Sequence, residues 1–256
     1  MPRRRTNRLT DEQLGEVLEL AGKADSVELK VTVPASDHRT AVRALGLDAL
    51  EAQIRQVFFF DTPDLRLNAA GVVARARRIQ GRSGDTVVKL RPVEPSALPD
   101  DLRASRNLVV EVDAMPGGYV CSASLKGRVD GAAVLDASLG KSSVRKLFTK
   151  EQRSFFTAHA PDGLVLDELA VLGPTFVLKQ TLTPKKLGRR LVAELWLYPD
   201  GSRILELSTK CTGADAFQVA MEARAFLSAK GVDLDGRQET KTKAALAFYS
   251  KQLASR

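Results

Sequence analysis

Apolar and polar residues alternate in several short stretches of the chain. In 27–33, four apolar residues alternate with Glu28, Lys30 and Thr32, so a strand would place the two kinds of side chain on opposite faces. Later stretches repeat charges two positions apart: Arg75 and Arg77, Lys89 and Arg91, and Glu111 and Asp113. In 206–210, the polar residues Glu206, Ser208 and Lys210 occupy alternate positions. This pattern fits either a sandwich with solvated outer faces or a closed antiparallel barrel with an ionic lumen. We favour the barrel, because both signs of charge recur on one face of several strands.

The same periodicities predict the remaining elements. The predicted strands cover 27–33, 56–62, 72–80, 86–91, 107–114, 125–135, 149–157, 164–170, 175–181, 190–198 and 203–210. The predicted helices cover 10–20, 38–46, 48–54, 142–149, 217–227 and 239–252. A capping box at Thr10–Gln13 opens the first helix, and Phe217 and Met221 belong to the apolar stripe of the fifth. We expect a basic arm and short helix over 1–22, followed by a single α+β domain over 23–256.

Composition narrows the class of protein. The 256 residues are 44% hydrophobic, enough for a substantial core, and the net charge of +8 is compatible with polyanionic ligands. Cys121 and Cys211 are far apart and lack metal-binding spacing, which predicts two reduced thiols. The basic N-terminus, with Arg3–Arg5 and Arg8, has no apolar segment after it, and no run approaches the roughly 18 apolar residues of a membrane span. We therefore expect a cytoplasmic protein that does not bind membranes.

Familiar catalytic motifs are absent. Gly140-Lys141-Ser142 suggests a phosphate-binding loop, but the Walker pattern requires glycine where Leu135 stands. The two histidines, His38 and His159, lie in no nucleophile or metalloprotease context. Neither the P-loop nor a histidine-based mechanism is indicated.

The ordered series of charged segments resembles the CYTH superfamily, the triphosphate tunnel metalloenzymes. Residues 26–30 stand where the family has its opening E-x-E-x-K strand, and 59–63 match its aromatic-F-D-T-P segment. The arginine, lysine and acidic strands of the family resemble 74–77, 87–91 and 110–113. Further matches follow in order: its K-x-R segment at 150–153, its L-D strand at 164–167, its E-L-E-x-K strand at 206–210 and its closing helix from 242.

The resemblance implies a closed eight-stranded antiparallel β-barrel, or tunnel, with helices packed on the outside. It implies Mg²⁺ or Mn²⁺ as cofactor and a triphosphate-containing small molecule or polyphosphate as ligand. The implied catalytic residues are Glu28, Lys30, Arg75 and Arg77. The implied substrate-binding residues are Lys30, Arg75, Arg77, Lys89, Arg91, Arg153 and Lys210. The implied metal ligands are Glu28, Glu111, Asp113 and Glu206.

Two departures from the family pattern concern the metal. Ser26 replaces the first glutamate of the opening motif, and Ser208 replaces the second acid of the closing one. A neutral hydroxyl is a weaker ligand for a hard divalent cation than a carboxylate is. Glu194 would compensate only if its strand turns it inward, and neighbouring Trp196 then lies near the ligand or packs in the core.

The leading functional hypothesis is a metal-dependent triphosphatase acting on an inorganic or organic triphosphate. Class IV adenylate cyclase is the alternative enzyme, although no residue identifies an adenine pocket. The two serines favour a third possibility, a non-catalytic CYTH protein that binds phosphate chains or nucleotides. Specific nucleic-acid binding ranks last, because no reading helix or aromatic RNA-binding strand is present.

Overall fold

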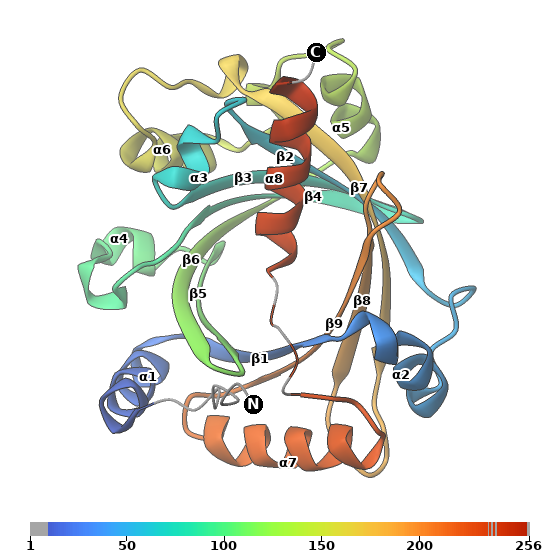
Figure 1. Ribbon diagram of the computed structural model, residues 1–256. Coiled ribbons are helices and arrows are strands. Elements are labelled where there is room, and N and C mark those ends of the chain that lie inside the picture. Colours follow the sequence, from blue (N-terminus) through green and yellow to red (C-terminus); the bar gives the residue numbers. More distant parts are fainter. Residues whose placement is uncertain (1–9, 235, 237, 239, 255–256) are drawn as a thin grey trace.

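A closed β-barrel forms the centre of the molecule. The computed structural model describes residues 10–234, 236, 238 and 240–254; the basic arm at Arg3–Arg5 and Arg8 lies outside this part. The strands are β1 (Ser26–Val33), β2 (Gln53–Asp61), β3 (Val72–Ile79), β4 (Arg82–Leu90), β5 (Leu108–Met115), β6 (Gly118–Val129), β7 (Ala170–Leu182), β8 (Leu191–Leu197) and β9 (Arg203–Cys211). Around the barrel they follow the order β1-β5-β6-β4-β3-β2-β7-β8-β9, and β9 pairs with β1 (Figure 1).

The barrel is mixed, which corrects the expected eight-stranded antiparallel tunnel. Nine strands close the ring within the described residues, and β1 pairs with β5 in parallel. Directions cannot alternate all the way round a ring with an odd number of strands, so at least one neighbouring pair must be parallel. That pair sets Ser26 beside Glu111 and Glu28 beside Asp113.

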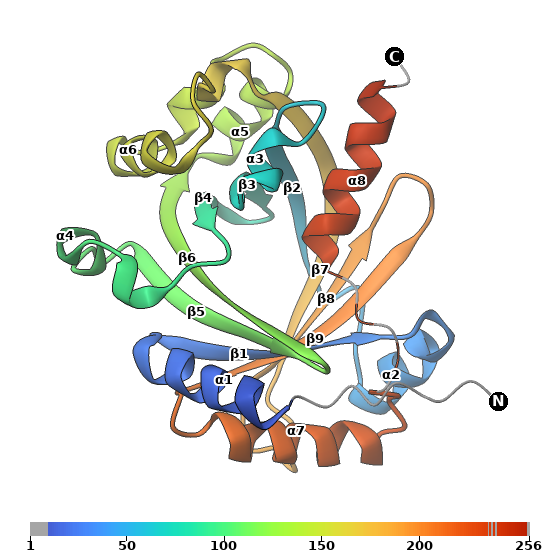
Figure 2. The ribbon, with the colours of Figure 1, turned by 60° about the vertical axis from the view of Figure 1, so that its left-hand side comes forward.

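Helices cover the outside of much of the barrel (Figures 1 and 2). The helices are α1 (Asp11–Lys23), α2 (His38–Leu45), α3 (Arg66–Ala69), α4 (Asp100–Arg103), α5 (Gly131–Ser138), α6 (Lys150–His159), α7 (Ala216–Ala229) and α8 (Lys241–Ala254). Short 3₁₀ turns lie at Ala35–Asp37, Pro95–Ala97, Val144–Leu147 and Leu166–Glu168. The outward residues of the arginine strand, Ala74 and Ala76, are fully buried in the same apolar cluster as Phe155 and Phe156 of α6. Small outward residues thus let helices approach the barrel closely.

Helix α8 lies differently, across one opening of the barrel (Figure 1). Its Leu246 and Tyr249 pack in one cluster with Val57, Phe59 and Trp196. Val57 and Phe59 alternate with outward Phe58 and Phe60, which belong to the cluster under the outer helices, so they face inward. The closing helix therefore covers the lumen, contrary to the expectation that all helices pack outside.

Several local predictions are confirmed. The Thr10 and Gln13 side chains form the predicted capping box of α1, and Gly46 ends α2 in the left-handed conformation with φ 67°. The hairpin of β8 and β9 turns at the predicted residues 199–202. Within the matched aromatic-F-D-T-P segment, Asp61 has a structural role: its carboxylate accepts backbone N–H groups of Thr62, Leu67 and Asn68.

Other local predictions are wrong. Residues 149–157 were expected as a strand but form α6, whose Thr149 and Gln152 make a second capping box. Gly131–Ser138 forms a helix capped by Asp130 rather than continuing the strand expected over 125–135. The helix expected over 48–54 is absent because β2 begins at Gln53, and the strand expected over 164–170 is a 3₁₀ turn before the single long β7. On α7 the buried stripe runs through Val219 and Phe226, while Phe217 is 66% exposed and Met221 is 55% exposed.

None of the helices in the described part of the chain combines the length and hydrophobicity of a membrane span. The prediction of a single domain over 23–256 stays a prediction. Both free thiols are present as expected, with Cys121 buried and Cys211 partly buried.

Gln152 is expected to be a large contributor to stability, because its fully buried side chain satisfies three polar groups of neighbouring residues. Its Oε1 accepts the Thr149 N–H and the Thr86 hydroxyl, and its Nε2 donates to the carbonyl of Leu125. Gln152→Leu leaves these groups unpaired, so we expect the free energy of unfolding to fall by about 2–4 kcal/mol. Urea denaturation measures the loss. Ser154→Ala, an exposed change on the same helix, is the control, and an equal effect of both changes would contradict the assignment.

Candidate functional site: an ionic tunnel

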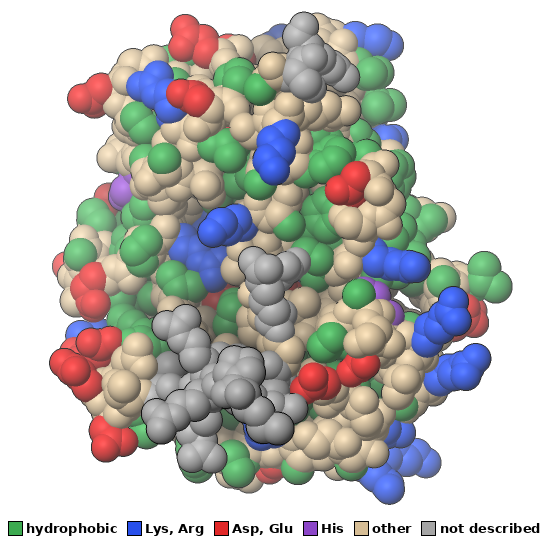
Figure 3. Space-filling model, viewed as in Figure 1, with side chains coloured by type: hydrophobic (Ala, Val, Ile, Leu, Met, Phe, Trp, Pro, Cys, Tyr) green, Lys and Arg blue, Asp and Glu red, His purple; other side chains and the backbone are tan. Residues whose placement is uncertain are grey.

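A cavity of about 510 Å³ occupies the barrel lumen. Among the described residues, twelve lysines and arginines line it but only six acids do, so cations outnumber carboxylates by six. Blue side chains are visible in a hollow left of the centre of the face viewed in Figure 3. Such a surplus of buried positive charge suits an anionic ligand.

The structure brings together nearly all the site residues predicted from sequence. The cavity is lined by Glu28, Lys30, Arg75, Arg77, Lys89, Arg91, Glu111, Asp113, Glu206 and Lys210. Arg153 does not line it: this residue lies on the outer helix α6, and its guanidinium donates to the carbonyl of Phe148. The strand expected over 149–157 would have carried Arg153 inward, and the helix does not.

Sequence reasoning missed a second set of cavity residues, most of them isolated charges on strands. They are Arg55, Arg82, Asp85, Lys126, Lys179, Arg190 and Lys241. Arg55 shares a face with Val57 and Phe59, and this period-two relation was the available signal. Lys241 begins a helix, and only the fold brings it into the lumen. Glu194 and Trp196, whose direction was left open, both line the cavity.

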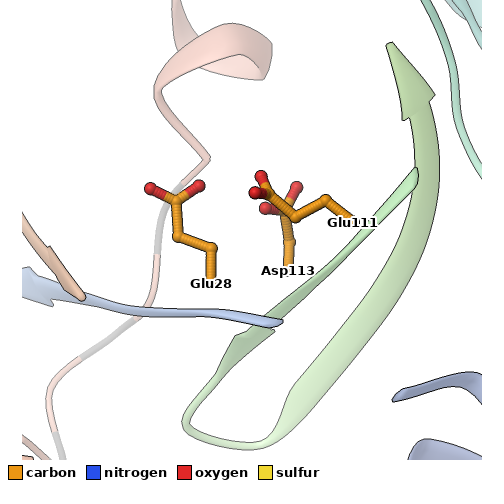
Figure 4. Close-up of side chains that lie close together, drawn as sticks. All are labelled: Glu28, Glu111 and Asp113. Carbon is orange, nitrogen blue, oxygen red and sulfur yellow. The ribbon is translucent and has the colours of Figure 1, made fainter. Parts of the chain in front are cut away.

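Three carboxylates gather where β1 and β5 run in parallel. Oxygens of Glu28, Glu111 and Asp113 all lie within 4.8 Å of one another. Figure 4 shows the three groups facing a common space. Carboxylate oxygens are the ligands that Mg²⁺ and Mn²⁺ prefer, so this donor set fits a divalent cation. Glu206, the fourth expected ligand, lies outside this cluster.

Each serine that departs from the family pattern hydrogen-bonds a carboxylate of the cluster. The Ser26 hydroxyl donates to Glu111 Oε2 at 3.1 Å, and the Ser208 hydroxyl donates to Glu28 Oε1 at 3.1 Å. The serines thus orient carboxylates rather than adding negative charge.

Asp113 is shared by three cations. Its carboxylate lies 2.7 Å from the Lys30 ammonium, 3.2 Å from that of Lys89 and 3.6 Å from the Arg91 guanidinium. Burial opposes ionisation of Asp113, but Lys89 and Lys30 outweigh it and hold its pKa well below the usual range. One carboxylate cannot compensate three cations equally. Burial lowers the pKa of Lys89 to about 8, whereas Asp113 and Glu28 outweigh burial and raise the pKa of Lys30.

Glu28 stays ionised for a similar reason. Burial would raise its pKa, but Lys30 at 3.0 Å, followed by Lys210 and Lys241, lowers it to about 2. The Lys210 ammonium also contacts Glu111. Glu28 and Asp113 are therefore charged near neutral pH, as metal binding requires.

The opposite wall carries the unbalanced cations. Arg77 makes a bidentate pair with Asp85, with both N–O distances 2.7 Å. Arg75, its neighbour on the inward face, has a buried Nε with no hydrogen-bond partner among the described residues. Burial, reinforced by Arg77, lowers the Arg75 pKa to about 10. An arginine stays protonated at neutral pH under these conditions, so the Arg75 guanidinium can donate a charge-assisted hydrogen bond to an anion in the lumen.

Lys179 and Arg55 extend this cationic wall. Burial, followed by repulsion from Arg55, lowers the pKa of Lys179 to about 8, and burial with repulsion from Arg77 lowers that of Arg55 to about 10. Their shared carboxylate, Glu194, lies 3.9 and 4.0 Å away and is more tightly held by Lys241.

Two solved structures share the overall fold of this chain. HpAC1 from Hippeastrum, provisionally classed as an adenylyl cyclase and described as having a dominant triphosphatase activity, superposes with a TM-score of 0.64 at 17% identity, covering 86% of this chain and 95% of its own. A protein of Bacillus halodurans, provisionally classed as an adenylate cyclase, gives 0.59 at 12% identity, covering 86% and 96%. The chain shares the fold of these two solved structures, here a closed β-barrel. A scan of family models and a search of curated protein sequences found no match to this chain.

The tunnel should bind anions less tightly as the pH rises, because Lys89 and Lys179 lose their protons with pKa values of about 8. We compare the wild type with Lys89→Arg/Lys179→Arg, whose guanidiniums stay charged. The ratio of the wild-type Kd to the variant Kd at each pH removes the effect of ligand ionisation, because that effect is the same for both proteins.

Titration calorimetry with tripolyphosphate in metal-free buffer measures the effect. Between pH 7 and pH 9.5 the wild-type Kd should rise at least about tenfold more than the variant Kd. A ratio independent of pH would contradict a role for these two lysines in charge balance.

Proposed function

We propose that the tunnel binds a triphosphate group and hydrolyses it with Mg²⁺ or Mn²⁺. The observation that carries this proposal is Arg75, whose buried guanidinium nitrogen has no partner in the described structure. A buried cation left in this state costs several kcal/mol, and a phosphate oxygen would offset that cost. The excess of six cations along the cavity suits a ligand with several negative charges. The triphosphatase activity of the Hippeastrum neighbour supports the same reaction class.

The tunnel residues divide into two groups with different tasks. Arg75, Arg77 and Lys89 would bind the phosphate oxygens, with the arginines able to hold two oxygens each. Glu28, Glu111 and Asp113 would hold the divalent cation, which when bound offsets phosphate charge and orients a water molecule. The two groups face one lumen, so the ligand would bridge the cationic wall and the acidic cluster.

The lining favours an inorganic triphosphate over a nucleotide. Trp196 is the one aromatic residue among the described residues that line the cavity. Its ring faces the Lys241 ammonium at 5.3 Å from the centroid, and its Nε1 donates to Glu194. A base therefore has no free aromatic surface on which to stack, and adenylate cyclase gains no support from the site.

Arg75→Gln should weaken tripolyphosphate binding by about 10- to 100-fold, because it removes a charge-assisted contact worth about 1.5–3 kcal/mol. Titration calorimetry measures the Kd. Arg153→Gln is the matched control, since Arg153 lies on α6 outside the tunnel. If both variants bind as the wild type does, or both lose affinity equally, the anion is not held by the tunnel.

Tripolyphosphate hydrolysis should require a divalent cation and the acidic cluster. We expect phosphate release with Mg²⁺ or Mn²⁺, background rates in excess chelator, and a loss of about 100-fold or more in Asp113→Asn. Assays with ATP, reading phosphate, pyrophosphate and cyclic nucleotide separately, should show slower turnover than with tripolyphosphate. Tight tripolyphosphate binding without any turnover would identify a binding protein instead. Faster turnover of ATP to cyclic nucleotide would identify a cyclase.

A further inference from the structure

Lys241 bridges two inward carboxylates. Its ammonium lies 2.5 Å from Glu194 Oε2 and 2.7 Å from Glu206 Oε1. Glu194 and Glu206 stand directly opposite each other on β8 and β9, so their charges would repel without a cation between them. The three side chains are at most 18% exposed. The bridge is thus a buried ionic group, distinct from the cluster on β1 and β5.

Helix formation does not explain the position of Lys241. It is the first residue of α8, where the helix dipole disfavours a cation and favours an acid. The helix is held across the lumen by Leu246 and Tyr249, which pack with Val57 and Phe59. This packing places the Lys241 ammonium beside the two glutamates, although a cation at the N-terminus destabilises the helix. We take this as a sign that Lys241 acts on the glutamates.

The bridge also accounts for the place of Glu206. Carboxylate oxygens of Glu28, Glu111 and Asp113 converge within 4.8 Å, and Glu206 does not join them. On β9, Ser208 lies between Glu206 and Lys210 in the inward row, and it donates a hydrogen bond to Glu28 and brings no charge. Glu194 and Glu206 face the same lumen as the cluster, and both are bound by the Lys241 ammonium.

We propose that Lys241 takes the place of a second divalent cation in the tunnel. The ammonium occupies the Glu194–Glu206 pair permanently, so the tunnel holds one metal ion, at Glu28, Glu111 and Asp113. Lys241 is a positioning residue: it fixes the two glutamates, excludes metal from them and leaves positive charge facing the ligand. This inference rests on the proposed function only in assigning one ion to the acidic cluster.

Mn²⁺ binding to the full-length, metal-free protein tests the proposal. Calorimetry and the electron paramagnetic resonance signal of free Mn²⁺ give the number of bound ions. We expect one ion for the wild type, two for Lys241→Met, which keeps the length of the side chain without its charge, and one for Lys241→Arg. Trp196 is the only tryptophan of the chain and lies beside the bridge, so bound Mn²⁺ should quench its fluorescence more strongly in Lys241→Met.

Glu206→Gln in the wild-type background tests the proposal independently, because this test does not depend on the folding of Lys241→Met. In the wild-type background we expect the Mn²⁺ Kd to stay within about threefold, whereas Asp113→Asn should raise it by at least about thirtyfold. In the Lys241→Met background, Glu206→Gln should remove the second ion.

Equal Mn²⁺ stoichiometry in the wild type and Lys241→Met, including none in both, would overturn the proposal. So would a Glu206→Gln loss as large as that of Asp113→Asn. The proposed function is judged by the wild type alone. If the wild type binds no Mn²⁺ and Lys241→Met binds one ion, the result supports the exclusion of metal by Lys241. The same result contradicts the proposal that the acidic cluster binds a metal ion.

Discussion

Closure of the barrel forces every second residue of each strand into a space shared with residues from all the others. In an open sheet, Glu28 and Lys30 would face water on a solvated surface. In the ring closed by β1 between β5 and β9, they instead meet Asp113, Lys210 and Ser208 across short distances. Water no longer screens these charges fully. Each charge is therefore stabilised by an opposite charge in the lumen or by an ion bound from solution. The chemistry of the site follows from this confinement.

The confined charges are balanced on one side of the lumen and unbalanced on the other. The acidic cluster is fully paired, and Asp113 alone contacts three cations. The facing wall has Arg75, whose Nε has no partner among the residues that the structure describes, and Lys179 and Arg55 lie near a glutamate already held by Lys241. The charges of the chain alone therefore leave an electrostatic cost in the tunnel. A polyanion that binds only the folded barrel would relieve that cost and stabilise the protein by mass action.

The tunnel was predictable where the signal is periodic. Charges at alternate positions gave the inward faces of β1, β3, β4, β5 and β9, and with them ten of the cavity residues. The errors have two causes. A local capping signal was overlooked at Thr149–Gln152, which moved Arg153 from a strand to a helix. Tertiary placement decided the others: the parallel pairing of β1 with β5 and the position of α8 depend on contacts between distant segments, so no short window of sequence contains them.

The positions of the cations explain why serines at 26 and 208 are compatible with the acidic cluster. Each removes a negative charge from a lumen in which cations already exceed acids, which by itself would worsen the imbalance. Yet both hydroxyls donate to the remaining carboxylates, so they fix the geometry of Glu111 and Glu28. A carboxylate at either position would lie within reach of that same cluster and repel it unless a second cation were present. With the Lys241 ammonium committed to Glu194 and Glu206, neutral donors beside the acidic cluster are the consistent choice, and the lost charge leaves more of the cationic wall for the phosphate groups.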